Sequence, residues 1–306
     1  MSTVLKVENL SHRYSSAWAI REINFEISTT GVIGLLGSNG AGKSTTMNII
    51  CGVLKQTEGD VYINGINKKD DPRLAKRQLG FLPQTPPLHA DFTVNEYLTY
   101  AADLRFIDKM HVKKAVAEAM DKTGISHFSS RLIRNLSGGY KQRVGIAQAI
   151  IHKPSVVVLD EPTNGLDPNQ IIEARKLIRE IGRDHIVLLS SHVLSEINLL
   201  CRDIIMIEGG RIVFSDSMDS FNNYLQPASV ITVMENPPAE AELMKIPGAT
   251  KVEFLTAKQC RIYFTGNNTI TESIIAASMQ HGWRIQEISL ERSLLDDVFK
   301  QLSRQS

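Results

Sequence analysis

Several features that would place the chain in a special class of protein are missing from its 306 residues. No uninterrupted apolar run approaches the ~20 residues that a membrane-spanning helix needs. The N-terminus lacks the basic segment and apolar core of a secretory signal. Lysine and arginine number 34 against 33 aspartates and glutamates, so no charge excess favours a nucleic acid as partner. The sequence predicts a globular protein of the cytoplasm.

Cysteine is also scarce. The three cysteines, Cys51, Cys201 and Cys260, are odd in number, far apart in the sequence and without the spacing of a metal site. Disulfides are typical of oxidising compartments. This pattern therefore indicates reduced thiols in the core or on the surface, and a reducing compartment.

The length favours two domains, or one large domain with an appendage. Near the N-terminus, Val4–Val7 and Ile23–Ile27 alternate apolar with polar residues, as antiparallel strands with one solvated face do. Three further segments, Gly31–Leu36, Val156–Leu159 and Ile186–Leu189, are apolar throughout and are followed by loops and helical patterns. Strands of this kind alternating with helices predict an α/β fold with a parallel sheet covered on both faces.

A helical region is predicted between the first and second of these buried strands, over about residues 88–150. Thr93 and Glu96 have the spacing of a capping box at a helix start. Val112, Val116 and Met120 repeat every four residues, as the buried face of a helix does. The first unit ends in a strand pair, Asp203–Ile207 and Arg211–Phe214, across a turn that contains Gly-Gly, a favoured hairpin sequence.

A second unit is predicted over residues 217–306. Its expected elements are strand Val230–Met234, helix Ala239–Ile246, strands Lys251–Leu255 and Cys260–Phe264, helix Ile270–His281, strand Trp283–Ile288, and a final helix over 291–302. The order β-α-β-β-α-β is that of a ferredoxin-like sandwich, a small α+β domain. Its sequence shows no recognisable group of catalytic residues. Its apolar strands can form a hydrophobic core within this unit.

The strongest local motif is Gly37-Ser38-Asn39-Gly40-Ala41-Gly42-Lys43-Ser44, which fits the phosphate-loop pattern G-x-x-x-x-G-K-[ST]. Glycines let backbone N–H groups converge on phosphate oxygens, and the following helix directs its positive end at them. In such a loop Lys43 reaches the β- and γ-phosphates, and the Ser44 hydroxyl ligates Mg²⁺. The alternative is a glycine-rich surface turn, but the preceding buried strand and following helix favour a nucleotide site.

A second motif supplies carboxylates. The buried strand Val156–Leu159 leads into Asp160 and Glu161, at the sheet edge where open parallel sheets bind their ligands. Asp160 is suited to the Mg²⁺ shell. The side chain of Glu161 leaves the strand in a different direction, where it can face an attacking water. Apolar runs that end in acids are common, so this motif alone is weak evidence for a nucleotide site. Together with the phosphate loop it is strong evidence.

A third motif, Leu136-Ser137-Gly138-Gly139-Tyr140, precedes another helix. Ser137 is a favourable N-cap residue, and the two glycines leave the backbone open, so the segment is a second candidate anion site. One ATP does not need two such sites from one chain. Both sites are explained if the second one contacts a nucleotide that is bound to the phosphate loop of another copy of the chain.

Together these motifs resemble those of an ATP-binding-cassette (ABC) ATPase, the ATP-binding subunit of ABC transporters, over about residues 1–225. The resemblance implies a P-loop NTPase core over residues 1–216, with a mixed sheet, an antiparallel β-sheet and a helical subdomain. It implies that ATP and Mg²⁺ bind in a head-to-tail dimer, between Gly37–Thr45 of one copy and Leu136–Tyr140 of the other. It further implies separate membrane permease subunits, a position on the cytoplasmic face of the inner membrane, and no nucleic-acid partner.

The resemblance also assigns roles to single residues. Tyr14 matches the aromatic that stacks on adenine, and Gln84 matches the glutamine that contacts Mg²⁺ and water. Asp167 fits the loop that crosses the dimer, and His192 fits the histidine that contacts the γ-phosphate. Taken singly, these four have ordinary alternatives: a strand-end aromatic, a loop amide, a turn residue, and a histidine that caps or packs at a helix start. Tyr140 departs from the glutamine of many members.

The subgroup is suggested by two further segments. The run Asp160–Pro168 and the tail segment 290–299 are similar to those of bacterial exporter ATPases of the multidrug and gliding-motility-associated subgroup. The tail is expected to support dimerisation or regulation. Importer ATPases remain an alternative, as does a cassette ATPase acting on ribosomes or DNA, although such proteins normally carry two cassettes or long coiled coils. A non-hydrolysing module is disfavoured because Glu161 and His192 are both present.

Overall fold

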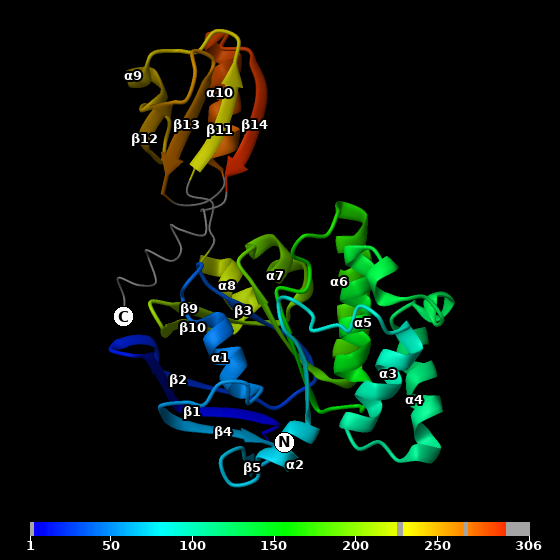
Figure 1. Cartoon of the computed structure of the whole chain (residues 1–306). Helices are drawn as coiled ribbons and strands as arrows, with labels where there is room; N and C mark the ends of the chain where they lie inside the picture. Colours follow the sequence, from blue (N-terminus) through cyan, green and yellow to red (C-terminus); the bar gives the residue numbers. More distant parts are fainter. Residues whose placement is uncertain (1–2, 225–228, 266–268, 292–306) are drawn as a thin grey trace. The chain divides into compact units, whose positions relative to one another are not determined.

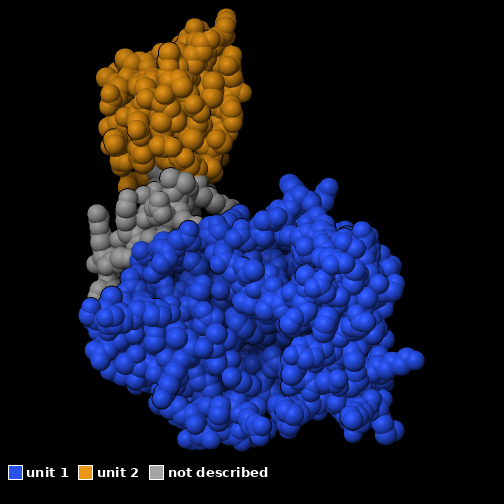
Figure 2. Space-filling view, in the orientation of Figure 1, with its two compact units in different colours: residues 1–218 blue, residues 219–306 orange. Residues whose placement is uncertain are grey.

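The computed structural model of the chain describes residues 3–224, 229–265 and 269–291 (Figure 1). The chain divides into two compact units, residues 1–218 and 219–306 (Figure 2). Among the described residues, no helix has both the length and the apolar character needed to cross a bilayer. Each unit has its own arrangement of strands and helices.

The first unit contains an antiparallel sheet in the order β2-β1-β4-β5. Its strands are β1 (Leu5–Tyr14), β2 (Ala17–Ile27), β4 (Glu58–Ile63) and β5 (Ile66–Asn67). β1 covers the predicted segment Val4–Val7 from Leu5 on, and β2 includes all of the predicted segment Ile23–Ile27. β4 and β5 were not predicted, because a short strand that contains a glycine and an aspartate carries little alternating pattern.

The second sheet of this unit has the order β10-β9-β3-β8-β7-β6. Its strands are β3 (Gly31–Leu36), β6 (Leu79–Leu82), β7 (Val156–Asp160), β8 (Ile186–Ser191), β9 (Asp203–Glu208) and β10 (Arg211–Ser217). All neighbours are parallel except β10, which pairs antiparallel with β9 through a turn at Gly209 and Gly210 with φ of 54° and 79°. Every residue of β7 and β8 is buried, as predicted for central strands.

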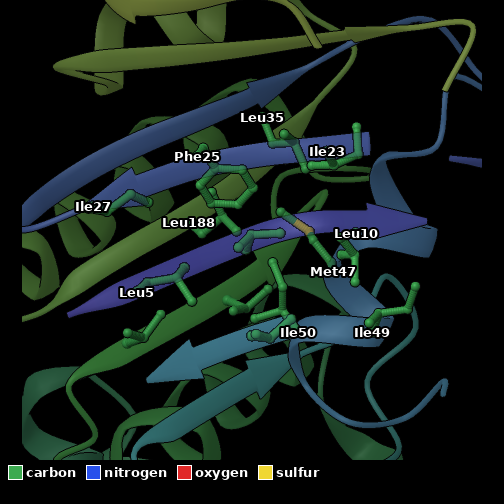
Figure 3. Close-up of a cluster of buried hydrophobic side chains, with 14 of the residues drawn as sticks. Leu5, Leu10, Ile23, Phe25, Ile27, Leu35, Met47, Ile49, Ile50 and Leu188 are labelled. Atoms are coloured by element: carbon green, nitrogen blue, oxygen red, sulfur yellow. The ribbon is translucent and has the colours of Figure 1, made fainter. Parts of the chain in front are cut away.

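The main core lies between the two sheets and includes helix α1 (Lys43–Ile50). Leu5 and Phe25 of the antiparallel sheet meet Leu188 of the mixed sheet, and Met47 projects into the same cluster from α1 (Figure 3). A short helix, α2 (Pro72–Arg77), also belongs to this unit, and the helix α8 (Met218–Tyr224) begins at its last residue.

Three helices, α5 (Gly138–Ile150), α6 (Pro168–Asp184) and α7 (Leu194–Leu200), pack against the mixed sheet. The approach of α7 is close, because a Cβ at Gly34 of β3 would lie 2.7 Å from a methyl of Ile197. The predicted α/β fold, with helices and a second sheet around a mostly parallel sheet, is confirmed.

A smaller cluster of buried residues belongs to α3 (Val94–Leu104), α4 (Lys109–Lys122) and the 3₁₀ helices η1 (Ser126–Phe128) and η2 (Ile133–Asn135), together with α5. Both hydrogen bonds of the predicted capping box between Thr93 and Glu96 are present at the start of α3. Val112, Val116 and Met120 are buried on α4, as their spacing predicted.

The second unit is an antiparallel sheet in the order β12-β13-β11-β14 with its own core. The elements are β11 (Ser229–Met234), α9 (Glu240–Leu243), β12 (Ala249–Phe254), β13 (Gln259–Phe264), α10 (Ile270–His281) and β14 (Ile285–Glu291). This element order and strand order agree with the predicted ferredoxin-like sandwich.

Three details of this unit differ from the prediction. The helix expected over 239–246 is limited to α9. Trp283 is buried but precedes β14, because Gly282 ends α10 in a left-handed conformation and Arg284 has φ of 55°. The final helix expected over 291–302 falls outside the described residues, except for Glu291, which ends β14.

A buried cation lies beneath α1. The Lys68 ammonium donates a hydrogen bond to the carbonyl of Ile49, in the last turn of α1, and the residue is only 7% exposed. Carbonyls at a helix C-terminus lack partners within the helix and attract cations. Burial nevertheless disfavours the charged form and lowers the pKa of Lys68 from 10.5 to about 8.

This pKa predicts a pH-dependent stability. Between pH 8 and pH 10.5 the unfolded chain binds more protons at Lys68 than the folded chain, so the free energy of unfolding rises with pH. From pH 7.5 to pH 9.5 the contribution of this group rises by about 2 kcal/mol. Lys68→Met is expected to remove that rise, measured by urea unfolding at both pH values. Lys55→Met, at an exposed lysine, is the control; an unchanged rise in Lys68→Met would contradict the prediction.

Candidate active site

A cavity of about 590 Å³ lies where β7 and β8 end and α1 begins. The carboxyl ends of parallel strands meet at one edge of a sheet, which explains why segments far apart in sequence converge here. The residues that line it are Ala19, Asn39, Gly40, Gly42, Lys43, Ser44, Thr45, Gln84, Glu161, Asn164 and His192. Nine of these eleven are residues that the sequence predicted for the ATP site.

The phosphate loop depends on the conformation of Gly42. Its φ is 110°, and a Cβ there would lie 2.5 Å from a methyl of Ile20 and 2.9 Å from the carbonyl oxygen of Ala19. Only glycine is compatible with both this backbone conformation and this close approach. The loop is thereby held against β2 and enters α1 at Lys43, so that the N-terminus of α1 adjoins the cavity.

Lys43 is 6% exposed, and its Nζ donates to the carbonyls of Gly37 (2.9 Å) and Ser38 (3.0 Å). Burial lowers the pKa of Lys43, while the negative charges of Glu161 and Asp160 act in the opposite direction. The ammonium is therefore anchored to the loop and lies in the field of two carboxylates. This arrangement suits a side chain that contacts phosphate oxygens.

Asp160 ends β7 and is 5% exposed. Its Oδ1 accepts a hydrogen bond from Ser190 Oγ at 2.5 Å, and Ser44 Oγ is 3.4 Å from the same atom. A carboxylate and a hydroxyl, with the side-chain carbonyl of Gln84 in the same cavity, form the set of oxygen donors that Mg²⁺ prefers. The residues present therefore fit the predicted metal site.

Glu161 follows β7 with φ of 48°, a left-handed conformation that is uncommon for residues other than glycine. Its side chain is 11% exposed and is held on both oxygens. Oε1 lies 3.0 Å from His192 Nδ1, and Oε2 accepts from Gln84 Nε2 and Asn164 Nδ2, each at 3.2 Å. A carboxylate fixed in this way beside the phosphate loop can accept a proton from a water molecule.

The position of His192 corrects one expectation. It lies in the loop between β8 and α7 and does not begin the helix, which starts at Leu194. The loop position lets the imidazole reach Glu161 while the side chain remains 47% exposed.

The other predicted residues lie outside the lining of this cavity in the described structure. Gly37, Ser38 and Ala41 belong to the phosphate loop itself. Tyr14, at the end of β1, is 53% exposed and contacts the His12 ring edge-on. None of these four residues is among those that line the cavity.

The third motif and the predicted crossing loop are also separate from the cavity. Ser137, Gly138 and Gly139 form the start of α5, where Ser137 occupies the N-cap position without the side-chain hydrogen bond that was expected of it. Asp167 caps α6, accepting from the backbone N–H groups of Asn169 and Gln170 at 3.0 Å.

Two contributors to the site were missed by the sequence analysis. Asn164 follows Glu161 by three residues, and its role is visible only once the turn brings its amide back to that carboxylate. Ser190 pairs in register with Asp160 across the neighbouring parallel strands. A polar residue at the carboxyl end of a fully apolar strand was the available signal for Ser190.

Comparisons with known proteins agree with this geometry. The family model described as "ABC transporter" matches residues 20–164. The bacitracin transport ATP-binding protein BcrA of Bacillus licheniformis is 36% identical over 70% of this chain and 69% of its own length. The linearmycin resistance ATP-binding protein LnrL of Bacillus subtilis is 28% identical over 96% of this chain and 97% of its own.

A solved structure extends the likeness to three dimensions. The dimeric ATP-binding cassette MJ0796, in a post-hydrolysis state bound to ADP and Pi, has a TM-score of 0.63 and 25% identity, covering 70% of this chain and 98% of that one. The sequence motifs, the fold and the relatives lead to one assignment. The chain belongs to the ABC transporter family, as an ATP-binding subunit with ATPase activity.

Proposed function

We propose that the cavity beside the phosphate loop is the site of ATP hydrolysis and that Glu161 is its general base. The observation that carries this proposal is the set of three hydrogen bonds on the Glu161 carboxylate, from Gln84, Asn164 and His192. They fix its direction next to the loop where the phosphates of ATP bind. A base held in position needs little reorganisation when the reaction occurs.

In the proposed reaction a water oxygen bonds to the γ-phosphorus of ATP, the bond from phosphorus to the β–γ bridging oxygen breaks, and Glu161 takes the proton of the water. Lys43 and the backbone N–H groups at the start of α1 stabilise the negative charge on the transferred group. Mg²⁺, held by Ser44, Asp160 and Gln84, would supply further charge neutralisation on the phosphate oxygens. His192 would contact the γ-phosphate.

We further propose that a second copy completes the site. Ser137, Gly138 and Asp167 lie at helix starts away from the cavity of their own chain. A Cβ at Gly138 would meet no heavy atom within 4 Å, so its backbone is open to approach. Tyr14 is exposed enough to stack on adenine. We propose a head-to-tail arrangement with ATP between the copies, and the dimeric, nucleotide-bound form of MJ0796 supports the dimer.

The partner in the membrane is proposed to dock on another face of the first unit. A cavity of about 660 Å³ between α2, β6 and α3 is lined by aromatic, aliphatic and basic side chains. Tyr100, Leu104 and Phe106 there are 42%, 58% and 69% exposed, and Arg73 and Arg77 lie on the same lining. Exposed apolar groups gathered at one concavity mark interaction sites. A permease segment with apolar and acidic side chains fits it.

Within transporters, an exporter is the proposed type, located on the cytoplasmic face of the inner membrane. The names of BcrA and LnrL, which refer to bacitracin transport and linearmycin resistance, support this direction of transport. We propose that residues 217–306 form an accessory domain for dimerisation or regulation, because its core is built from its own strands and helices.

If the permease docks at this cavity, a substitution there should weaken binding to the permease without changing the rate of ATP hydrolysis. Leu104→Glu is expected to reduce recovery of a polytopic membrane protein with the tagged chain from gently solubilised membranes by about ten-fold, because a buried charge without a partner is costly. The ATPase rate of the isolated chain should stay unchanged. Met110→Glu, at an 88% exposed position on α4, is the control. Equal recovery with all three proteins would exclude this docking face, and recovery of ribosomes or nucleic acid with no membrane protein would exclude the transporter partner.

A further inference from the structure

Glu196 is a buried carboxylate close to the proposed catalytic groups. It lies in the first turn of α7 and is 7% exposed. A buried carboxylate is costly unless it is hydrogen-bonded and paired. Here its Oε2 accepts from Thr163 Oγ1 at 2.8 Å and from Ser191 Oγ at 3.1 Å, and its Oε1 lies 3.5 Å from Arg175 NH2.

These three partners come from different elements. Thr163 lies in the loop after β7, two residues beyond Glu161. Ser191 ends β8 and directly precedes His192. Arg175 lies on α6, the helix that Asp167 caps. Glu196 therefore joins the loop that carries Glu161, the strand that directly precedes His192 and the helix that Asp167 caps.

The loop between Glu161 and Asp167 buries Pro162 and Thr163 and leaves Asn164 and Gly165 exposed. Asn164 N–H donates to the carbonyl of Glu161 at 3.1 Å, and Leu166 N–H donates to that of Thr163 at 3.3 Å, so the turn is compact within itself. The Thr163 hydroxyl links this turn to α7 through its hydrogen bond to Glu196. Asn164, the next residue, in turn holds Glu161.

We propose that Glu196 is a positioning residue that, through Thr163 and Ser191, sets the Glu161 carboxylate and the His192 imidazole at the separation that hydrolysis requires. The inference rests on the proposed function of Glu161. Misplacement of a reacting group by about 1 Å can cost about 10²-fold in rate. A tether that fixes two loops therefore affects turnover more than it affects ATP binding, which depends on the phosphate loop.

A purely structural role is the alternative, because a carboxylate in the first turn of a helix also stabilises that helix. Ser191 Oγ accepts from the backbone N–H of Val193, the residue that precedes α7, and donates to Glu196 Oε2, so both side chains are also tied to the start of that helix. Thr163 is not part of α7 and, in the described structure, makes no hydrogen bond to the residues at its start other than Glu196. Substitution of Thr163 thus tests the tether without altering the start of the helix.

The test compares Thr163→Val with Thr163→Ser in the full chain. Valine has the shape of threonine without its hydroxyl, and serine keeps the hydroxyl. We expect Thr163→Val to lower kcat for ATP by about ten-fold with KM and ATP affinity within about two-fold of wild type. Thr163→Ser is expected to stay within about two-fold of wild type in both constants. Thermal unfolding and calorimetric ATP binding are measured on the same samples.

The outcomes separate the alternatives. The proposal is overturned if Thr163→Val has the kcat of wild type. It is also overturned if Thr163→Val and Thr163→Ser lose kcat to the same extent and both show a matching fall in Tm. If Thr163→Val does not fold, Thr163→Ala takes its place, with the same expected loss of kcat at constant KM. Glu161→Gln is assayed in parallel: if it keeps turnover, the proposed function fails, whereas loss there with full turnover in Thr163→Val rejects only the tether.

Discussion

Replacing Glu161 with glutamine is expected to lower the ATP turnover number by about 10²- to 10⁴-fold, the range for removal of a general base. Glutamine has the shape of glutamate but cannot take the proton of the attacking water. Its carbonyl oxygen can still accept from Gln84 or Asn164, so the loop should keep its conformation. ATP affinity should be retained, because it depends on the phosphate loop and on Lys43.

The measurement has two parts: phosphate release under saturating MgATP, and ATP binding by calorimetry on the same preparation. Glu58→Gln, at an exposed position at the start of β4, is the control and should match wild type in both. The variant should also accumulate as an ATP-bound dimer in size-exclusion chromatography if a second copy completes the site. Undiminished phosphate release in Glu161→Gln would remove this residue as the base.

The parts of the fold that were predictable from sequence are those in which a local pattern has one physical explanation. β7 and β8 are apolar over Val156–Leu159 and Ile186–Leu189 because helices and a second sheet cover both faces, and that composition is visible in the sequence. The phosphate loop was predictable for a similar reason. Gly42 adopts a conformation and makes a close contact that only glycine allows. A glycine at this position of the motif therefore predicts the backbone conformation of the loop.

The contacts that complete the site have no such local signature. Glu196 reaches Thr163 and Ser191 from a different helix, and nothing in the spacing of these residues indicates that they meet. The left-handed conformation of Glu161 is likewise absent from the sequence, because glutamate has no special preference for it. Tertiary packing decides these features.

The substitution His192→Ala is expected to have the second large effect, a fall of about 10²-fold in turnover, at the lower end of the range for groups that act on a proton or a developing charge. The imidazole is hydrogen-bonded to Glu161 through Nδ1, and no hydrogen bond from the described residues reaches Nε2. One ring can therefore orient the base and contact the γ-phosphate at once. His111→Ala, at an exposed position on α4, is the control and should leave phosphate release unchanged.

A double substitution separates these two actions of His192. If the imidazole acts only by orienting Glu161, His192→Ala introduced into Glu161→Gln removes nothing further, and ATP affinity matches that of the single Glu161→Gln variant. If it also contacts the γ-phosphate, ATP affinity falls in the double variant while ADP affinity does not, because ADP lacks that group. We expect the second result, with ATP affinity about ten-fold weaker, since a hydrogen bond to a charged group contributes about 1.5 kcal/mol at the lower end of its range. Equal ATP affinities in the two variants would confine His192 to an orienting role.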